Sequence, residues 1–213
     1  GLLTSHGKID RALQQYITMG DTYYQMAELD RAREKYNEAL QLAPRGDLEQ
    51  RWAVRILHRI GDIDMQRIDW RRAISVYEEI RQLAPDDEKA RMTLIDLYYR
   101  FDRPTRAIVE LDELIKALRQ SNKGQKIIPV LEGIAQEHPE DIPIRTRLAQ
   151  AYLNARDVEG ALAQLDTLGE LQIQTGRIEE AMRTIKTILR LNPRNADAYQ
   201  ELLKQLASGQ ITP

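Results

Sequence analysis

The feature that most constrains this chain is a pattern of aromatic, small and proline residues that recurs along most of its 213 residues. The first copy extends from Leu13 to Pro44, which is long enough for two short helices and a turn. One such pair cannot bury its apolar stripe alone, so neighbouring units must stack to form a core. We therefore predict an array of helix pairs rather than a globule around a single core.

The spacing within the first copy resembles the tetratricopeptide repeat, a helix-turn-helix unit with the signature W-x2-L-G-x2-Y…A-x3-F…P. The matching residues are Tyr16, Met19, Gly20, Tyr23, Ala32, Tyr36, Ala39 and Pro44. Further copies contain Leu57, Ile60, Gly61, Ala73, Tyr77, Ile80 and Pro85, and then Leu94, Ile95, Tyr98, Ala107, Leu111 and Leu114. The resemblance implies an all-α fold, a right-handed α-solenoid of antiparallel helix pairs.

Glycines and one aspartate distinguish the copies from one another. A glycine inside a helix costs about 1 kcal/mol relative to alanine, so Gly20 and Gly61 indicate a close approach of the two helices of a pair. In the third copy Ile95 replaces this glycine. Asp64 is where the second copy departs from the signature, because the first copy has the matching aromatic residue Tyr23 at this position.

Seven additional residues precede the second copy, because Pro44 and Pro85 are 41 positions apart instead of the usual 34. They lie around Arg45 to Ala53, with Asp47 as a suitable N-cap. We expect them to lengthen the first helix of the second copy rather than form a loop.

A longer period follows, since Pro85, Pro139 and Pro193 are 54 residues apart. Arg91, Leu94, Tyr98, Ala107 and Leu111 all recur at this shift. The pattern predicts three-helix units and about eleven helices in total. The predicted organisation is one solenoid over residues 1–213, with two repeats at 7–85, three-helix units at 86–139 and 140–193, and a capping helix at 194–208.

The middle helix of each three-helix unit, roughly 104–121 and 158–174, fits two repeat registers at once. We expect it to be apolar on two faces and to pack between two neighbours. Turn residues should end these helices at Ser121–Gly124 and Thr175–Gly176, where Asn or Gly is available.

The composition excludes several classes of function. The net charge is −2, with 17 basic and 18 acidic side chains in residues 1–103 and 14 and 15 in residues 104–213. No basic region can follow a phosphate backbone, so no nucleic acid is expected as a partner. The apolar runs are far shorter than the roughly 20 residues of a membrane span, so no membrane insertion is expected. We expect a cytoplasmic location, unless this segment comes from an anchored or exported parent protein.

No catalytic, metal or cofactor site is predicted. The chain has no cysteine, and its three histidines, His6, His58 and His138, stand alone. No phosphate-binding loop, zinc motif or nucleophile motif occurs. We therefore expect a protein that is not an enzyme.

The resemblance implies that a protein or peptide partner lies in the concave groove formed by the first helices of the first three repeats. Counting from the matched positions, we predict these partner-binding residues: Ile17, Asp21, Tyr24, Arg55, His58, Arg59, Asp62, Met65, Lys89, Met92, Asp96 and Tyr99. Equivalent positions form a row of aspartates and, three residues on, a row of Tyr, Met and Tyr. Such rows favour a basic peptide.

Two other interpretations stay open at the sequence level, and a third is disfavoured. The aspartates can be a solvated face, with Tyr24 and Tyr99 packed against neighbouring helices. The chaperone-tail clamp of similar proteins is disfavoured, because Ile17 and Asp21 replace its Lys and Asn and aspartates would repel a terminal carboxylate. The array can also serve self-association or link domains, with contacts through Leu2, Leu3 and the terminal helix.

Overall fold

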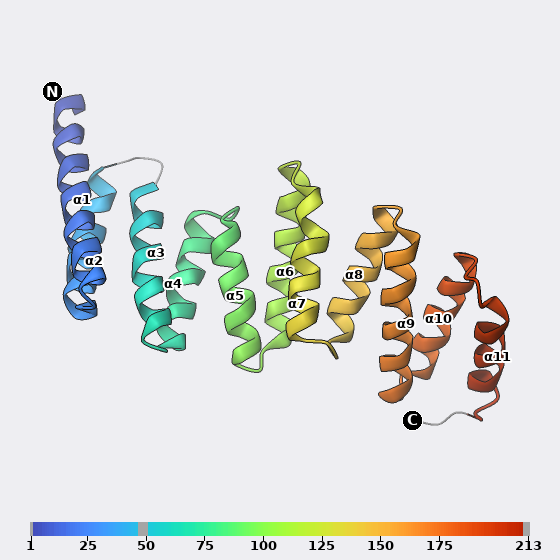
Figure 1. The fold of residues 1–213 in the computed structure, drawn as a ribbon. Coiled ribbons are helices and arrows are strands. Elements are labelled where there is room, and N and C mark those ends of the chain that lie inside the picture. Colours follow the sequence, from blue (N-terminus) through green and yellow to red (C-terminus); the bar gives the residue numbers. More distant parts are fainter. Residues whose placement is uncertain (1, 47–50, 211–213) are drawn as a thin grey trace. The chain divides into compact units, whose positions relative to one another are not determined.

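The computed structural model describes the backbone of residues 2–46 and 51–210 and the side chains of residues 7–46 and 51–210. These residues form eleven α-helices and two short 3-10 helices, with no strand among them (Figure 1). The predicted all-α fold of about eleven helices is confirmed. The chain divides into two compact units, residues 1–117 and 118–213, a division that lies inside a helix and at none of the predicted boundaries.

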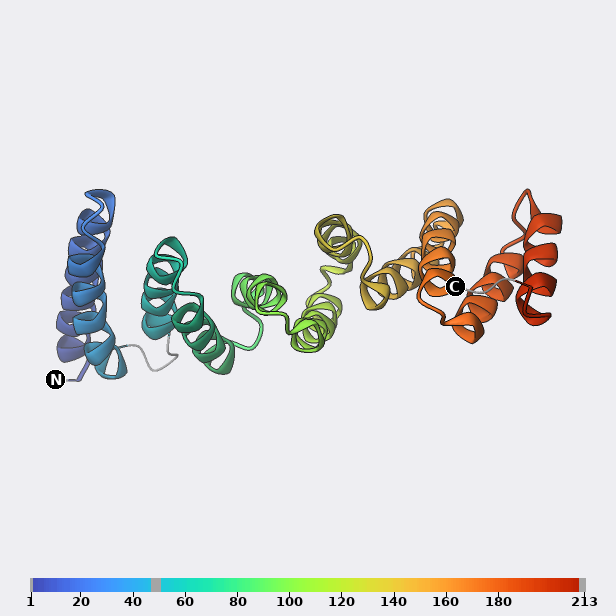
Figure 2. The ribbon, with the colours of Figure 1, turned by 90° about the horizontal axis from the view of Figure 1, so that it is seen from below.

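The first unit is built from successive helix pairs. Its helices are α1 (Leu2–Gln25), α2 (Leu29–Leu42), α3 (Arg51–Gln66), α4 (Trp70–Leu83), α5 (Glu88–Arg100) and most of α6 (Pro104–Gln120), with a 3-10 turn at Ala43–Arg45. Helix α1 packs on α2 and α3 on α4, and Figures 1 and 2 show each pair side by side. Contacts of α2 with α3 and of α4 with α5 join one pair to the next.

Tyrosine rings lie directly on helical glycines within the first two pairs. A Cβ atom at Gly20 in α1 would lie 2.4 Å from Cε1 of Tyr36 in α2, and one at Gly61 would lie 2.9 Å from the ring of Tyr77. Both rings are fully buried. Close packing of the ring offsets the conformational cost of glycine, as the sequence pattern predicts.

Each first helix of a pair ends with a residue in the left-handed conformation. These residues are Ala27 (φ 60°), Ile68 (φ 59°), Asp102 (φ 52°) and Arg156 (φ 61°), and the helices that precede Asn122 (φ 58°) and Gly176 (φ 73°) end in the same way. The amide of the following residue then donates to a carbonyl five residues back, as Glu28 N does to Tyr23 O at 2.9 Å. The predicted Asn and Gly helix ends are thereby confirmed.

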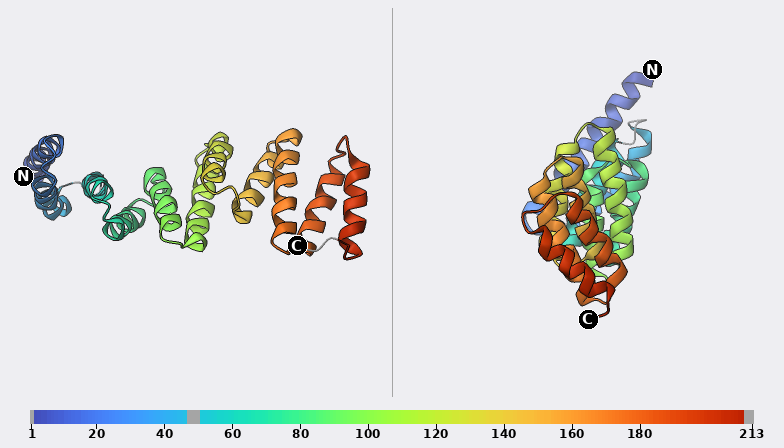
Figure 3. Two further views of the ribbon diagram at one scale, coloured as in Figure 1. Left: turned by 60° about the horizontal axis from the view of Figure 1, so that its bottom comes forward. Right: turned by 90° about the vertical axis from the view of Figure 1, so that its right-hand side faces the viewer.

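The second unit is also built from packed helices. Its helices are α7 (Ile127–Glu137), preceded by a 3-10 turn at Gly124–Lys126, then α8 (Ile142–Asn154), α9 (Val158–Gln174), α10 (Ile178–Arg190) and α11 (Ala196–Ala207). Helix α9 packs against both α8 and α10, as expected of a middle helix (Figure 3).

The 54-residue period appears in the helix bounds and in individual hydrogen bonds. Helices α5 and α8 have equal lengths and begin 54 residues apart, and α6 and α9 do the same. Three hydrogen bonds recur at this shift. The helix caps are equivalent, since Ala90 N donates to Asp87 and Ile144 N donates to Asp141. The side-chain bonds are equivalent too: Arg91 donates to Pro85 O and Arg145 to Pro139 O, while Tyr98 donates to Glu78 and Tyr152 to Glu132. Residues that are 54 positions apart therefore make the same contacts in both copies of the period.

A buried charge shows how the two three-helix units differ. Glu110 in α6 is buried and accepts hydrogen bonds from Arg81 and Arg91. At the positions 54 residues further along, Ala135 replaces Arg81 and Gln164 replaces Glu110. The loss of one arginine is thus accompanied by the loss of the carboxylate, and Arg145, the equivalent of Arg91, donates to the neutral Gln164 and to the carbonyl of Pro139 instead.

The additional residues before the second repeat are described only at their two ends. Ala43–Arg45 form a 3-10 turn, and α3 begins at Arg51. The predicted N-cap Asp47 lies outside the described residues. Arg45 ends this turn and Gly46 lies in a bend, upstream of the predicted N-cap, and the predicted lengthening over residues 47–50 stays a prediction.

We predict that Gly20→Ala lowers the free energy of unfolding by about 1–3 kcal/mol, because the added methyl group displaces the buried ring of Tyr36. The matched control is Gly133→Ala in α7, where no atom lies within 4 Å of the added Cβ. Alanine there should raise stability by up to about 1 kcal/mol through helix propensity. Urea denaturation measures both changes, and equal effects of the two substitutions would contradict the packing argument.

Candidate functional site

The predicted binding face lies on α1, α3 and α5 of the first unit, and its first aspartate has two partners. The hydroxyl group of Tyr36 donates to Oδ1 of Asp21 at 2.7 Å. From the next repeat, Nε of Arg59 donates to the same oxygen at 2.8 Å. Asp21 Oδ2 has only a weaker contact with Arg59, at 3.5 Å, and keeps capacity to accept hydrogen bonds.

Asp62 repeats this arrangement one unit further along. Its Oδ1 accepts from the hydroxyl of Tyr77 at 3.0 Å and from Nζ of Lys89 in α5 at 2.9 Å. Both aspartates are about one-third exposed, and both cations about half exposed. The two ion pairs therefore join first helices of successive repeats at the surface.

Asp96 departs from this pattern. Leu111 stands where the earlier repeats have a tyrosine, so no hydroxyl group reaches Asp96 from the second helix. The carboxylate instead accepts from Arg100 of its own helix at 2.8 Å. The row of aspartates is therefore balanced by cations of the chain itself, and it is not the uncompensated acidic strip that the sequence pattern suggests.

Four of the predicted residues meet in one cleft. Asp21, Tyr24, Arg59 and Asp62 line it together with Gln25, and its volume is about 300 Å³. Two carboxylates and one guanidinium group give the lining a net charge of −1. Tyr24 is 37% exposed and offers an aromatic wall.

Ile17 does not belong to the predicted binding face, and this prediction is wrong. Its side chain is 2% exposed and lies in the core cluster that also contains Leu13 and Ile56. Trp52 and Ala53, from the additional first turn of α3, pack against the same cluster. The longer α3 therefore provides apolar surface that covers the position.

His58 makes contacts within the protein that tie two helices together. Its Nε2 lies 2.7 Å from Oδ2 of Asp87, whose Oδ1 caps α5 by accepting from Ala90 N. The ring of His58 also meets Tyr77 edge to face at 6.0 Å. This contact ties α3 to the start of α5.

The remaining predicted residues are not part of the lining of this cleft. Arg55 is exposed and its guanidinium group lies 4.9 Å from the ring centre of Trp52. Met65, Met92 and Tyr99 are partly buried.

The tyrosine hydroxyls are the residues of the site that sequence reasoning missed. In the sequence Tyr36 and Tyr77 stand out only as residues that match the repeat signature, yet each also orients an aspartate of the predicted binding face. A usable signal existed, because each tyrosine follows its aspartate by 15 residues. Burial, together with the hydrogen bond and charge of the aspartate, raises the pKa of both hydroxyls, so they stay donors.

Electrostatics also holds Arg59 in its charged form. Partial burial lowers the pKa of its guanidinium group, but the hydrogen bond and charge of Asp21 outweigh this effect and raise it. Among the described residues no cluster of three or more metal-ligating side chains occurs. None of the described helices combines the length and apolar character that a membrane crossing requires.

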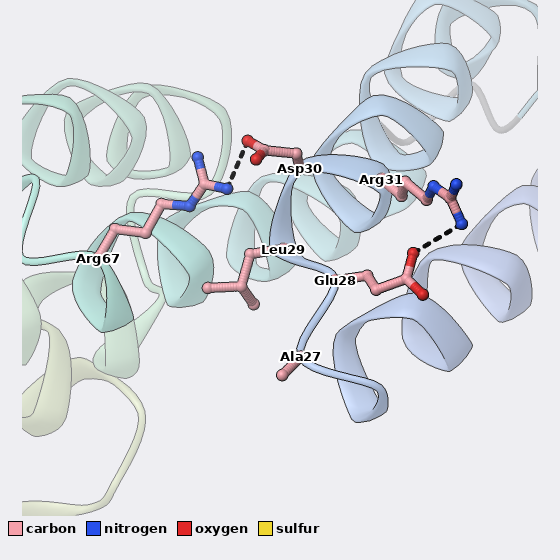
Figure 4. Close-up of a pocket in the computed structure, with 6 residues that line it drawn as sticks. All are labelled: Ala27, Glu28, Leu29, Asp30, Arg31 and Arg67. Carbon is pink, nitrogen blue, oxygen red and sulfur yellow. Dashed lines mark hydrogen bonds and ion pairs between the residues drawn. The ribbon is translucent and has the colours of Figure 1, made fainter.

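A second cleft, of about 550 Å³, lies at the turn between α1 and α2 and was not predicted from the sequence (Figure 4). Its lining residues are Ala27, Glu28, Leu29, Asp30, Arg31 and Arg67. Arg67 reaches Asp30 at 2.5 Å and Arg31 reaches Glu28 at 2.8 Å, so each charge in Figure 4 has a partner within the cleft. The cleft therefore offers no net charge to a ligand.

Comparisons with known proteins agree with this architecture. Models of the tetratricopeptide repeat family match residues 13–45, 65–127, 118–170 and 165–195. The chain belongs to the tetratricopeptide repeat family. The predicted all-α, solenoid-type fold is thereby confirmed, and proteins of the tetratricopeptide repeat family are protein–protein interaction scaffolds.

Solved structures of other tetratricopeptide repeat proteins are similar at low sequence identity. The crystal structure of MamA is 17% identical, with 79% of this chain and 96% of that chain covered and a TM-score of 0.45. YrrB, described as having an unusual peptide-binding site, is 16% identical, with 77% and 92% covered and a TM-score of 0.41. A tetratricopeptide repeat protein from Parabacteroides merdae is 14% identical, with 97% and 92% covered and a TM-score of 0.42. No curated protein matches the sequence.

We predict that this tetratricopeptide repeat protein loses stability as the pH rises from 10 towards 12. Burial and a hydrogen bond to Glu78 raise the pKa of Tyr98 to about 12, and a hydrogen bond to Glu132 and burial raise the pKa of Tyr152 to about 12. An unfolded tyrosine ionises near pH 10. Between these values the unfolded chain has released protons that the native chain keeps, so unfolding becomes more favourable.

Tyrosinate absorbance and circular dichroism, followed together against pH, measure this effect. Ionisation of these tyrosines should coincide with loss of helix. In Tyr98→Phe the stability at neutral pH should be lower and its decline above pH 10 shallower. Tyrosines that all ionise near pH 10 in a folded chain would contradict the prediction.

Proposed function

We propose that the chain is a non-catalytic scaffold that binds a polypeptide segment of a partner protein in the groove of its first three repeats, along α1, α3 and α5. The observation that carries this proposal is the cleft in which Asp21, Tyr24, Arg59 and Asp62 come together. An extended peptide can pass over this cleft and continue towards Lys89.

The polar groups of the predicted binding face suit the backbone of an extended peptide. Acceptors and donors alternate along it, in the order Asp21, Arg59, Asp62 and Lys89. A peptide backbone offers both N–H donors and C=O acceptors at short intervals. Asp21 Oδ2 can accept from such an N–H group, and the guanidinium group of Arg59 keeps further N–H donors.

The cleft itself suits a Lys or Arg side chain of the peptide. Its lining carries one more negative than positive charge, and the ring of Tyr24 can cover the aliphatic part of a long side chain. The ligand cation would share Asp21 with Arg59, an exposed pair that contributes little by itself. Binding should therefore be moderate in affinity and weaker at high salt.

Self-association, or a linking role in a larger protein, is the alternative proposal. Side chains of residues 2–6, and therefore Leu2 and Leu3, lie outside those that the structure describes. The described part of α11 exposes Gln200 and Lys204, which favours solvent over a partner. Sedimentation at several concentrations separates the alternatives, since a concentration-dependent dimer that binds no peptide would favour assembly.

We predict that Tyr24→Ala weakens the binding of peptides selected from a peptide array by about 5- to 30-fold, which corresponds to about 1–2 kcal/mol. The matched control is Met26→Ala, in the same repeat, outside the cleft and 61% exposed. It should leave the affinity unchanged. Fluorescence anisotropy measures both affinities, and an unaffected Tyr24 variant would place the peptide elsewhere.

We also predict that the selected peptides are enriched in Lys and Arg and that Asp62→Asn weakens their binding about tenfold. Asparagine can still accept from the hydroxyl of Tyr77 but removes the negative charge. Asp96→Asn, in the same row but outside the cleft, is the control and should have little effect. No preference for basic peptides, or equal effects of the two substitutions, would contradict the proposed ligand charge.

A further inference from the structure

Asp64 in α3 is a buried carboxylate that the predicted binding face does not use. Its side chain is 1% exposed and accepts a hydrogen bond from Arg33 of α2, and its Oδ2 has no hydrogen-bond partner. Burial, and then the positive charges of Arg72 and Arg67, lower the pKa of Arg33. Both groups of this ion pair therefore lose water at a cost that an apolar pair would avoid.

The other junctions between repeats use apolar pairs at these positions. A junction here is the contact between the second helix of one repeat and the first helix of the next, as between α2 and α3. The repeat spacing makes the following residues equivalent to Arg33 and Asp64: Ile74 and Tyr98 at α4 and α5, Ile128 and Tyr152 at α7 and α8, and Met182 and Leu206 at α10 and α11. At these positions, and within the described residues, the junction of α2 with α3 is the ionic one of the four. The buried charges near α4 and α5 are different residues, Arg81 and Arg91, and both pair with Glu110 of α6.

The apolar alternatives show that the fold itself does not need a charge there. Leu206 is buried, and Met182 packs against the core cluster that contains it. An ion pair at one junction therefore serves something other than the stability of the repeat.

We propose that the Arg33–Asp64 ion pair determines which helices can pack together, so that the outer face of α2 accepts the Asp64 face of α3 and rejects the others. If α2 packed against a first helix with Tyr or Leu at this position, the guanidinium group of Arg33 would be buried without a partner. If α3 packed against a second helix with Ile or Met at the position of Arg33, the carboxylate of Asp64 would be buried without a partner. Either mismatch costs much more than the matched pair, which prevents wrong stacking within a chain and between copies.

The first experiment compares the thermal midpoints of four full-length proteins: the wild type, Arg33→Met, Asp64→Leu and the double variant. The double variant copies the apolar pair Met182 and Leu206. Each single substitution should lower the midpoint by roughly 10 °C, because it leaves one charge buried alone. The double variant should regain the wild-type midpoint or exceed it. Single variants as stable as the wild type, or a double variant as unstable as the single ones, would overturn the proposal.

The second experiment tests selectivity between copies. Arg33→Asp and Asp64→Arg each place two like charges at the junction, so each variant alone should be destabilised. Refolded together, the two chains can exchange their first repeats, and each of the two α2–α3 junctions of the resulting heterodimer then holds one acid and one base. Sedimentation velocity should show at least ten times more dimer in the mixture than in either variant alone. Equal amounts of dimer in all three samples would show that the pair does not select its partner.

Discussion

The packing of a tyrosine ring on a glycine of the facing helix is the contact on which the rest of the first unit depends. It brings α1 close to α2 and α3 close to α4, and it points each hydroxyl group out of the core. The aspartate that follows the glycine receives this hydroxyl, so core packing determines the position of a carboxylate on the predicted binding face. Where Ile95 and Leu111 replace glycine and tyrosine, Asp96 pairs within its own helix instead.

Much of the fold could be predicted from the sequence, because its helix ends are encoded locally. The middle helices, expected at roughly 104–121 and 158–174, lie at Pro104–Gln120 and Val158–Gln174. Their ends follow from single residues, since Asn122 and Gly176 can adopt the left-handed conformation that closes a helix. The 54-residue period could also be predicted, because equivalent side chains make equivalent local hydrogen bonds.

The candidate site was less predictable, because its chemistry depends on side chains that reach between repeats. Repeat spacing brings Asp21 and Asp62 to one face, but it does not show that Arg59 extends back to Asp21. Periodicity assigns each residue a direction, whereas the pairing of long charged side chains depends on the distance between helices. The burial of Ile17 could not be predicted from its own repeat, because Trp52 and Ala53, which pack against its core cluster, belong to the next repeat.

Charged pairs distinguish the stacking faces of these otherwise similar repeats. Helix pairs with one consensus pattern present similar apolar faces, so apolar burial alone selects weakly among possible stacking partners. A buried charge selects strongly, because its cost depends on a single opposite group being present. The exposed ion pairs of the predicted binding face select their partners weakly, since water can replace either partner at little cost. Buried ion pairs are therefore suited to fix the order of the repeats, and exposed ones to exchange with a ligand.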